Sequence, residues 1–401
     1  MLCLNRIPAR LGALSLACGL LCTGAHAADM TWLGSGFMPT GTSNNGTAVI
    51  GNDYNTTRYS LWSGGALRDV GGAVASGAFG GIPQISADGS IISGTARNAA
   101  TGFYEAAFRR ADGGDWTLLG GIGGTSSQET SGGWAMSRNG RYVAGMAWDV
   151  GTAAGRGRGV IWDTTTGNLV ANVGTSGYST ASTRLNAISN DGKVAVGWGG
   201  SRSPMVWSDP DGDAQYSRFE IKPPSGVLQE AASVSADGRW VVGFGANGNP
   251  GGWRWSEATG LQSLPMLPGA PPRTYGYANA VSLDGSVIIG TQRTTGAQAY
   301  QGSGFIWTQS GGMQSFNDFV HGLGIDVAGA YSFALPTAMS EDASVIVGTA
   351  YAVNGGLVDS TPVGFMLTGL APVPEPSAAL MLVMGLACAG LARRRTVSSQ
   401  G

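Results

Sequence analysis

The folded part of the chain has almost none of the residues that build disulfides, zinc sites or histidine-based catalysis. Three of the four cysteines, at positions 3, 18 and 22, lie in an N-terminal leader, and Cys388 lies in a C-terminal apolar segment. His26 also belongs to the leader, so a catalytic triad or a histidine metal site would have to use His321. His321 stands in a glycine-rich stretch with no base nearby. We therefore expect a histidine in a surface loop and no zinc centre.

Basic residues are also scarce, which argues against a nucleic-acid partner. Between residues 28 and 373 the chain has 18 Arg and Lys against 24 Asp and Glu, a net charge of −6, and Lys193 and Lys222 are its only lysines. Nucleic-acid-binding domains normally show the opposite balance. None of the glycine pairs is followed by Lys-Ser or Lys-Thr, so the chain has no phosphate-binding loop of that type.

Glycine, by contrast, is abundant (68 of 401 residues), and much of it belongs to a motif that occurs seven times. The motif opens with Ser, any residue, Asp or Asn, and usually Gly; a further Gly follows eight residues after the Ser. The copies begin at Ser43, Ser86, Ser137, Ser189, Ser235, Ser282 and Ser340. Asp-Gly or Asn-Gly between aliphatic segments predicts a β-hairpin with a type I′ turn, in which both central residues have positive φ.

The segments after each hairpin predict a β-propeller. A third apolar segment follows, ending in Trp in five of the seven copies, and then a short turn and a fourth strand. Four strands in about fifty residues are typical of a propeller blade. Residues 30–34 resemble a fourth strand standing before the first hairpin, whereas the last unit stops after its third strand. We therefore predict an all-β, seven-bladed propeller of four-stranded blades, with the N-terminal strand closing the last blade. The alternative is a β-solenoid, whose repeats are shorter and need caps.

Residues 1–27 have the organisation of a secretory signal peptide. Arg6 and Arg10 precede an apolar run at 11–21, and small residues mark the expected cleavage site at Ala25, Ala27 and Ala28. A lipoprotein signal at one of the two later leader cysteines is an alternative that fits less well. We expect export through the inner membrane and a mature chain that starts at Ala28.

The C-terminus is organised as a second targeting segment. A Val-Pro-Glu-Pro motif at 373–376 is followed by an apolar run at 378–392 and by three arginines at 393–395. Fifteen residues extend roughly 22 Å as a helix, short of a hydrocarbon core of roughly 30 Å. We predict a marginal transmembrane sorting helix, held by snorkelling arginines. The expected sorting residues are Val373, Pro374, Glu375, Pro376, Arg393, Arg394 and Arg395.

The motif, the apolar run and the basic cluster together resemble the PEP-CTERM sorting signal. This resemblance implies a Gram-negative source that makes extracellular polysaccharide, and an exosortase that processes the tail at the inner membrane. The propeller repeats also resemble the bacterial extracellular HAF repeats, through residues 106–109, Ala-Ala-Phe-Arg. We accordingly expect a signal peptide at 1–27, a propeller at 28–371 and a sorting signal at 372–401, with the protein held transiently in the membrane before it reaches the cell surface.

One acidic stretch has the spacing of a calcium loop. Asp209, Asp211, Asp213 and Glu220 match positions 1, 3, 5 and 12 of an EF-hand. The glycine required at position 6 is replaced by Ala214, and the stretch falls where each unit has a strand-to-strand turn. We therefore favour a solvated turn over a Ca²⁺ site, and we expect no other cofactor.

Binding residues are expected on the face that carries the loops between second and third strands and between blades. These loops vary from unit to unit, while the turns of the opposite face are alike, and variable loops on a rigid scaffold usually carry function. The aromatic side chains expected to stack on sugars there are Trp148, Trp198 and Tyr300. We expect a non-enzymatic surface protein that binds or scaffolds exopolysaccharide or biofilm matrix. The alternatives are a glycan-active hydrolase or lyase with paired carboxylates, and a protein-binding adhesin.

Overall fold

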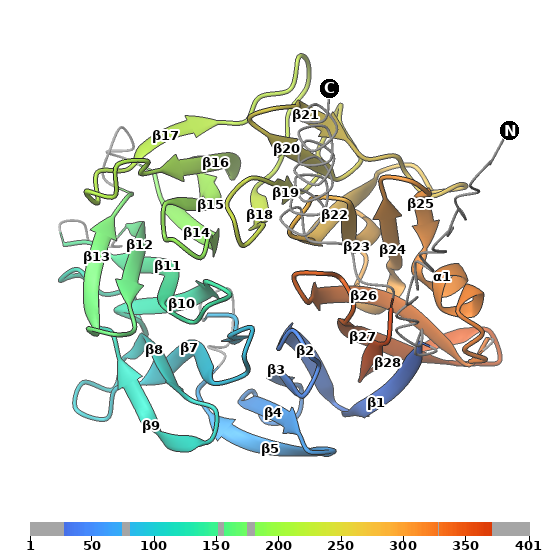
Figure 1. Ribbon diagram of the computed structural model, residues 1–401, viewed down its shortest axis with the longest axis horizontal. Coiled ribbons are helices and arrows are strands. Elements are labelled where there is room, and N and C mark those ends of the chain that lie inside the picture. The colour runs from blue at the N-terminus through green and yellow to red at the C-terminus, as the bar shows by residue number, and fades with distance from the viewer. Residues whose placement is uncertain (1–27, 74–80, 151–155, 175–180, 328, 371–401) are drawn as a thin grey trace, which may run out of the picture.

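The computed structural model describes residues 28–73, 81–150, 156–174, 181–327 and 329–370 (Figure 1). Its strands form seven antiparallel sheets of four, placed around a central axis as blades, which confirms the predicted propeller. The predicted signal peptide and sorting tail lie outside the described residues. Among the helices of the described ranges, none combines the length and the apolar character needed to cross a membrane.

Each blade runs outward from its innermost strand. The first three blades are β2 (Phe37–Thr42), β3 (Ala48–Asp53), β4 (Tyr59–Ser63), β5 (Ala66–Gly71); β6 (Gln84–Ile85), β7 (Ile91–Arg97), β8 (Tyr104–Arg110), β9 (Gly113–Leu118); and β10 (Ser131–Met136), β11 (Tyr142–Trp148), β12 (Gly157–Asp163), β13 (Asn168–Asn172). The next three are β14 (Thr183–Ile188), β15 (Val194–Gly199), β16 (Ser203–Ser208), β17 (Ser217–Glu220); β18 (Ala231–Val234), β19 (Val241–Gly243), β20 (Trp253–Ser256), β21 (Gly260–Ser263); and β22 (Thr274–Val281), β23 (Val287–Thr294), β24 (Ser303–Thr308), β25 (Gly312–Ser315).

The seventh blade combines the two ends of the described chain, as predicted. It consists of β26 (Tyr331–Met339), β27 (Ile346–Asn354), β28 (Leu357–Thr368) and, outermost, β1 (Asp29–Ser35). β1 pairs antiparallel with β28, with Trp32 opposite Phe365. Leu33 is buried, and the Trp32 ring lies 4.3 Å from that of Tyr331. The pairing covers the open edge of β28, which would otherwise expose unpaired backbone groups.

The seven repeated turns share one hydrogen-bond network, which the Ser282 turn illustrates. The Ser282 hydroxyl donates to Asp284 Oδ1 (2.7 Å) and accepts from the Val287 N–H (3.0 Å), and the Ser286 N–H donates to the same Asp284 oxygen (2.9 Å). Gly285 alone among the central residues has positive φ (74°). The predicted type I′ turn is therefore wrong. The Ser and Asp side chains satisfy the loop N–H groups, so the loop needs only one left-handed residue.

A β-bulge in the innermost strand explains the second glycine of the motif. In six blades the pairing register shifts at the residue three places before the turn Ser: Thr40, Trp134, Asn186, Ala232, Asn279 and Thr337. Beside the bulge, a carbonyl of the innermost strand comes close to the next strand. A Cβ on Gly197 would lie 2.0 Å from the Arg184 oxygen, and one on Gly290 would lie 2.1 Å from the Tyr277 oxygen. Only glycine fits such an approach.

We expect Gly290→Ala to destabilise the propeller by about 3 kcal/mol, because the new methyl group displaces backbone and the Phe305 ring in a packed core. Gly322→Ala is the matched control, since nothing lies within 4 Å of a Cβ there and its φ is not positive. Thermal melting of both variants measures the effect. Equal melting temperatures of the two variants would show that the close approach of the Tyr277 carbonyl does not require glycine at position 290.

The bulge side chains link neighbouring blades around the channel. Four of them donate to a backbone carbonyl of the next blade: Thr337 to Pro39 (2.8 Å), Thr40 to Pro83 (2.6 Å), Asn186 to Ala231 (2.8 Å) and Asn279 to Pro336 (2.8 Å). The third and fifth blades carry Trp134 and Ala232 at this position instead. The second blade has Pro83 there, so three of the seven blades lack a short polar side chain at this position.

A short helix between the sixth and seventh blades departs from the all-β prediction. α1 (Phe316–Gly322) begins after Ser315, whose hydroxyl accepts from the Asp318 N–H at 3.1 Å, and it buries Phe316 and Val320. His321 lies exposed in the last turn of this helix. Its surface position is as expected, but the predicted loop is wrong because an N-cap and apolar residues at helical spacing follow one another here. A 3₁₀ turn, η1 (Ala299–Gln301), precedes β24.

Candidate functional site at the channel mouth

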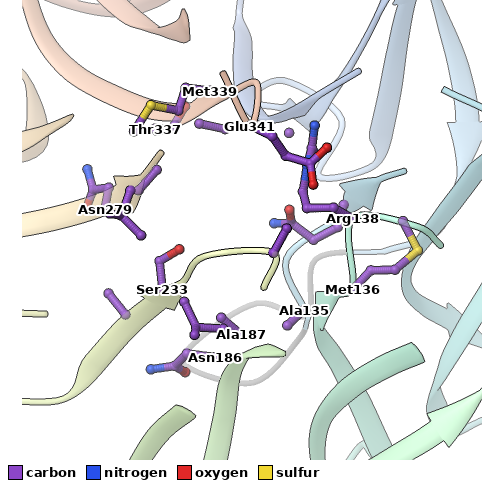
Figure 2. Close-up of a pocket in the computed structure, with 18 of the residues that line it drawn as sticks. Ala135, Met136, Arg138, Asn186, Ala187, Ser233, Asn279, Thr337, Met339 and Glu341 are labelled. Atoms are coloured by element: carbon purple, nitrogen blue, oxygen red, sulfur yellow. The ribbon is translucent and has the colours of Figure 1, made fainter. Parts of the chain in front are cut away.

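The seven repeated turns lie at one end of the channel, beside a small cavity. Arg138 and Glu341, each from a turn tip, lie together at one side of a cavity of about 140 Å³ (Figure 2). Arg138 donates to the Thr42 carbonyl (2.9 Å) and to Asn44 Oδ1 (2.7 Å), and the Asn44 amide donates to Glu341 (2.5 Å). Burial lowers the pKa of Arg138, and the Glu341 charge opposes that shift. These bonds fix the turn tips of three blades to one another.

The opposite end of the channel, the mouth, opens into a larger cavity of about 310 Å³. This end carries the loops expected to hold the binding residues. Its lining includes Thr40, Ile82, Gln84, Trp134, Arg184, Asn186, Glu230, Ala232, Phe244, Asn279, Leu335 and Thr337. Arg184 and Glu230 are the charged residues of this lining.

Two guanidinium groups share the carboxylate of Glu230. Arg184 Nη2 lies 3.0 Å from Glu230 Oε2, and Arg202 Nη2 lies 2.5 Å from Oε1. Arg184 Nε also donates to Asn186 Oδ1 at 2.9 Å. The side chains of Glu230 and Arg184 are 5 % and 15 % exposed, whereas that of Arg202 is 56 % exposed. Burial lowers the pKa of Arg184 to about 10, so this group stays charged at neutral pH.

Two tryptophans flank the Arg184 guanidinium. Its central carbon lies 3.9 Å from the ring centroid of Trp134 and 5.5 Å from that of Trp198, and Arg202 lies 5.7 Å from Trp198. Arg184 and Trp198 are opposite residues of β14 and β15, and Trp134 is the bulge residue of β10. Cation–π contacts of this kind orient a guanidinium as well as stabilise it. The cluster of Trp134, Arg184, Trp198, Arg202 and Glu230 is the mouth cluster.

The mouth cluster breaks the internal repeat. The residues five places before the turn Ser are, in order of blades, Met38, Gly81, Gly132, Arg184, Glu230, Tyr277 and Leu335. Only the fourth and fifth blades carry a charge at this position, and the charges have opposite signs and meet. Because the other five blades carry no charge at this position, the charged pair is a local feature of two neighbouring blades that the scaffold does not require.

The three aromatic residues expected to bind sugars have different surroundings. Trp198 belongs to the mouth cluster. Trp148 ends β11 and is 8 % exposed, so its predicted exposure on a loop is wrong; the backbone of residues 124–130 pairs with it and covers it. Tyr300 lies half-buried in η1, with its ring 6.0 Å from that of Tyr351. Its role in binding stays a prediction.

The predicted calcium ligands are engaged in a turn. The Asp209 carboxylate accepts the N–H groups of Gly212, Asp213 and Ala214 at 2.9–3.2 Å. Asp211 is exposed, Asp213 accepts from the Gln215 N–H (2.9 Å), and Glu220 pairs with Lys222 (3.3 Å). The chain described here brings no three His, Cys, Asp or Glu side chains together in a geometry that holds a metal ion. Ala214, at the position of the EF-hand glycine, has φ 64°.

One buried carboxyl on the loop face was not anticipated. Glu129, just before β10, is 1 % exposed, and burial raises its pKa to about 7, against an opposing hydrogen bond from the Trp148 side chain. Below about pH 7, the folded protein therefore favours the protonated form of Glu129. Burying the charged form destabilises the fold progressively as pH rises from about 4.5 to 7.

We expect Glu129→Gln to stabilise the protein above pH 7, by on the order of 3 kcal/mol, and to have little effect at pH 4. The amide keeps the shape of the protonated carboxyl and removes the cost of ionisation. The exposed Glu257→Gln is the matched control. Melting temperatures of both variants and of the unchanged protein between pH 4 and 8 test this. A stabilisation that did not grow with pH would contradict it.

Comparison with known proteins identifies the tail and the fold. The model of the PEP-CTERM protein-sorting motif matches residues 372–395, which indicates an exported protein sorted to the cell envelope. No curated protein matches the sequence. The resemblance of the blades to HAF repeats stays a prediction.

Several solved structures share the propeller fold at low identity. The β-propeller domain of the Trilobed protease from Pyrococcus furiosus is 11 % identical with a TM-score of 0.51, over 86 % of this chain and 100 % of that domain. An oligogalacturonate lyase in complex with manganese is 11 % identical with a TM-score of 0.50, over 88 % and 95 %. TolB from Acinetobacter baumannii is 14 % identical with a TM-score of 0.42, over 86 % and 82 %. At these identities the first two likenesses show the fold alone, and nothing is argued from the third.

Proposed function

We propose that this protein is a non-enzymatic, exosortase-sorted surface protein that binds extracellular polysaccharide in the channel mouth. The observation that carries the proposal is the mouth cluster, in which Trp134, Arg184 and Glu230 break the sevenfold repeat beside an open cavity. Aromatic faces stack on sugar rings, and planar side chains such as Arg, Glu and Asn form hydrogen bonds to hydroxyl groups. The sorting motif supports a location where polysaccharide is available.

The arrangement of the mouth favours binding over hydrolysis. Glycoside hydrolysis generally uses two carboxyl groups that flank one bond. Glu230 is the single carboxylate of the described mouth lining, and two guanidinium groups engage it. Glu341 also faces the channel, but it lies at the end of the repeated turns and not in the mouth. Each oxygen of this carboxylate already contacts a guanidinium group, so neither is presented freely to a substrate.

The test is binding of the exported protein to polysaccharide from the cells that produce it, measured by affinity electrophoresis and calorimetry. We expect Trp134→Ala to weaken binding at least tenfold, with Trp198→Ala as a second mouth variant. Trp255→Ala is the matched control, since Trp255 packs on Phe219 in an outer part of the fifth blade. Unchanged binding by both mouth variants would overturn the proposed site. New reducing ends or unsaturated sugars would assign the enzymatic alternative instead, and failure to bind polysaccharide would leave the adhesin alternative.

A further inference from the structure

The mouth cluster has more positive than negative charge. It holds two guanidinium groups and one carboxylate, although the region from 28 to 373 has six more acidic than basic residues. Arg184 and Glu230 line the cavity, and the excess positive charge is that of Arg202, which lies beside them and is more than half exposed. A local excess of positive charge in an otherwise acidic protein attracts an anionic group.

Both guanidinium groups retain donors for a further partner. Arg184 uses Nε for Asn186 and Nη2 for Glu230, and its Nη1 donates to no residue of the described chain. Arg202 uses Nη2 alone, for Glu230. A guanidinium has five N–H donors in a planar fork that matches a carboxylate. Since Glu230 occupies one side of each group, a second carboxylate can approach Arg184 from the cavity and Arg202 from the solvent.

The backbone at Arg202 supports the same conclusion independently. Arg202 lies in the tight connection between β15 and β16 and has φ 69°, the left-handed conformation that favours Gly or Asn. An arginine there costs stability relative to glycine. Its side chain extends across Trp198 to Glu230 and is still more than half exposed. An unfavourable backbone conformation at a residue whose side chain packs little against the protein is typical of a functional position.

We propose that the mouth recognises an acidic polysaccharide through the carboxylate of a uronic acid residue, bound between Arg202 and Arg184 Nη1. The sugar ring of that residue then lies against the part of Trp134 that lines the cavity. Glu230 holds the two guanidinium groups in position. This inference rests on the proposed function, since it names the chemical class of the ligand for the same site.

The experiment compares one polymer in two charge states. Polysaccharide from the producing cells is used as isolated and after chemical reduction of its uronic acid carboxyl groups to hydroxymethyl groups. This reduction leaves sulfate and phosphate substituents in place. We expect the reduced polymer to bind at least tenfold more weakly and the binding of the native polymer to weaken as NaCl increases.

The Arg202 variants then locate the effect. Arg202→Ala should weaken binding of the native polymer about tenfold and that of the reduced polymer less than twofold, and Arg202→Lys should restore part of the loss. Arg184 and Asn186 still hold Glu230 in these variants, so the fold should persist, and melting temperatures check that a loss of binding is not a loss of folding. Equal binding of native and reduced polymer, or an Arg202→Ala loss that is the same for both, would overturn the uronate inference. No binding of either polymer would instead overturn the proposed function on which it rests.

Discussion

Removal of residues 28–36 should unfold the propeller at temperatures where the intact protein is stable. β1 supplies the outer strand of the seventh blade, buries Leu33 and packs the Trp32 ring against that of Tyr331. Its loss removes a full ladder of backbone hydrogen bonds and exposes the edge of β28. Together these contributions amount to on the order of 5–10 kcal/mol, which is comparable to the whole stability of many proteins.

The truncated chain should be compared with one that starts at Ala28, so that both lack the leader. Thermal melting and limited proteolysis are the measurements. We expect a loss of about 10 °C or more in melting temperature and rapid cleavage within the blades. Because β1 joins the outer edge of the seventh blade to the start of the first blade, cleavage should not be confined to the seventh blade. A melting curve identical to that of the longer chain would contradict closure of the ring by the N-terminal strand.

Replacement of Pro374, Glu375 and Pro376 by Ala should stop sorting almost completely. These residues lie in the segment that matches the PEP-CTERM model, residues 372–395, and we expect an exosortase to recognise them. In a host that has this enzyme, the variant should accumulate in the inner-membrane fraction and be lost from the surface. Replacement of Ser398 and Ser399, beyond the matched segment, is the control. Normal surface delivery of the triple variant would argue for a plain tail anchor.

The architecture could be predicted because its determinants are local and repeated. Each Ser-x-Asp-Gly turn forms its hydrogen bonds within six residues, so that one pattern repeated seven times indicated seven hairpins. The spare strand at residues 30–34 and the missing strand after Thr368 indicated how the ring closes. The turn type was missed because side-chain bonds from Ser282 and Asp284 replace the second left-handed residue.

The mouth cluster could not be predicted in the same way because its members are distant in sequence. Arg184 and Glu230 are 46 residues apart in the sequence. Each lies two residues before a β-bulge, at Asn186 and Ala232, and the pattern of the sequence does not show where these bulges occur. A signal was nevertheless present. When the seven repeats are aligned at the turn Ser, the position five residues before it is charged only in the fourth and fifth blades, which are adjacent. The same alignment places Trp134 where most other blades have a small or polar residue.

Trp148 shows why loop aromatics alone are a weak indication of binding. It was expected to be exposed because it follows a strand in a variable region. In the structure β11 continues to include it, and its N–H and carbonyl bond with residues of the preceding connection. Trp198, by contrast, stays half-buried because the connection from β15 to β16 is only three residues long and cannot cover it.

The most direct measurement is a crystal structure of the exported protein with an oligosaccharide cut from the polysaccharide that the producing cells make. We predict a sugar ring against Trp134 in the channel mouth, with a carboxylate of the sugar within hydrogen-bonding distance of Arg184 and Arg202. An oligosaccharide bound to the face of the seven repeated turns, or on the outer strands with the mouth empty, would contradict the site proposed for this protein.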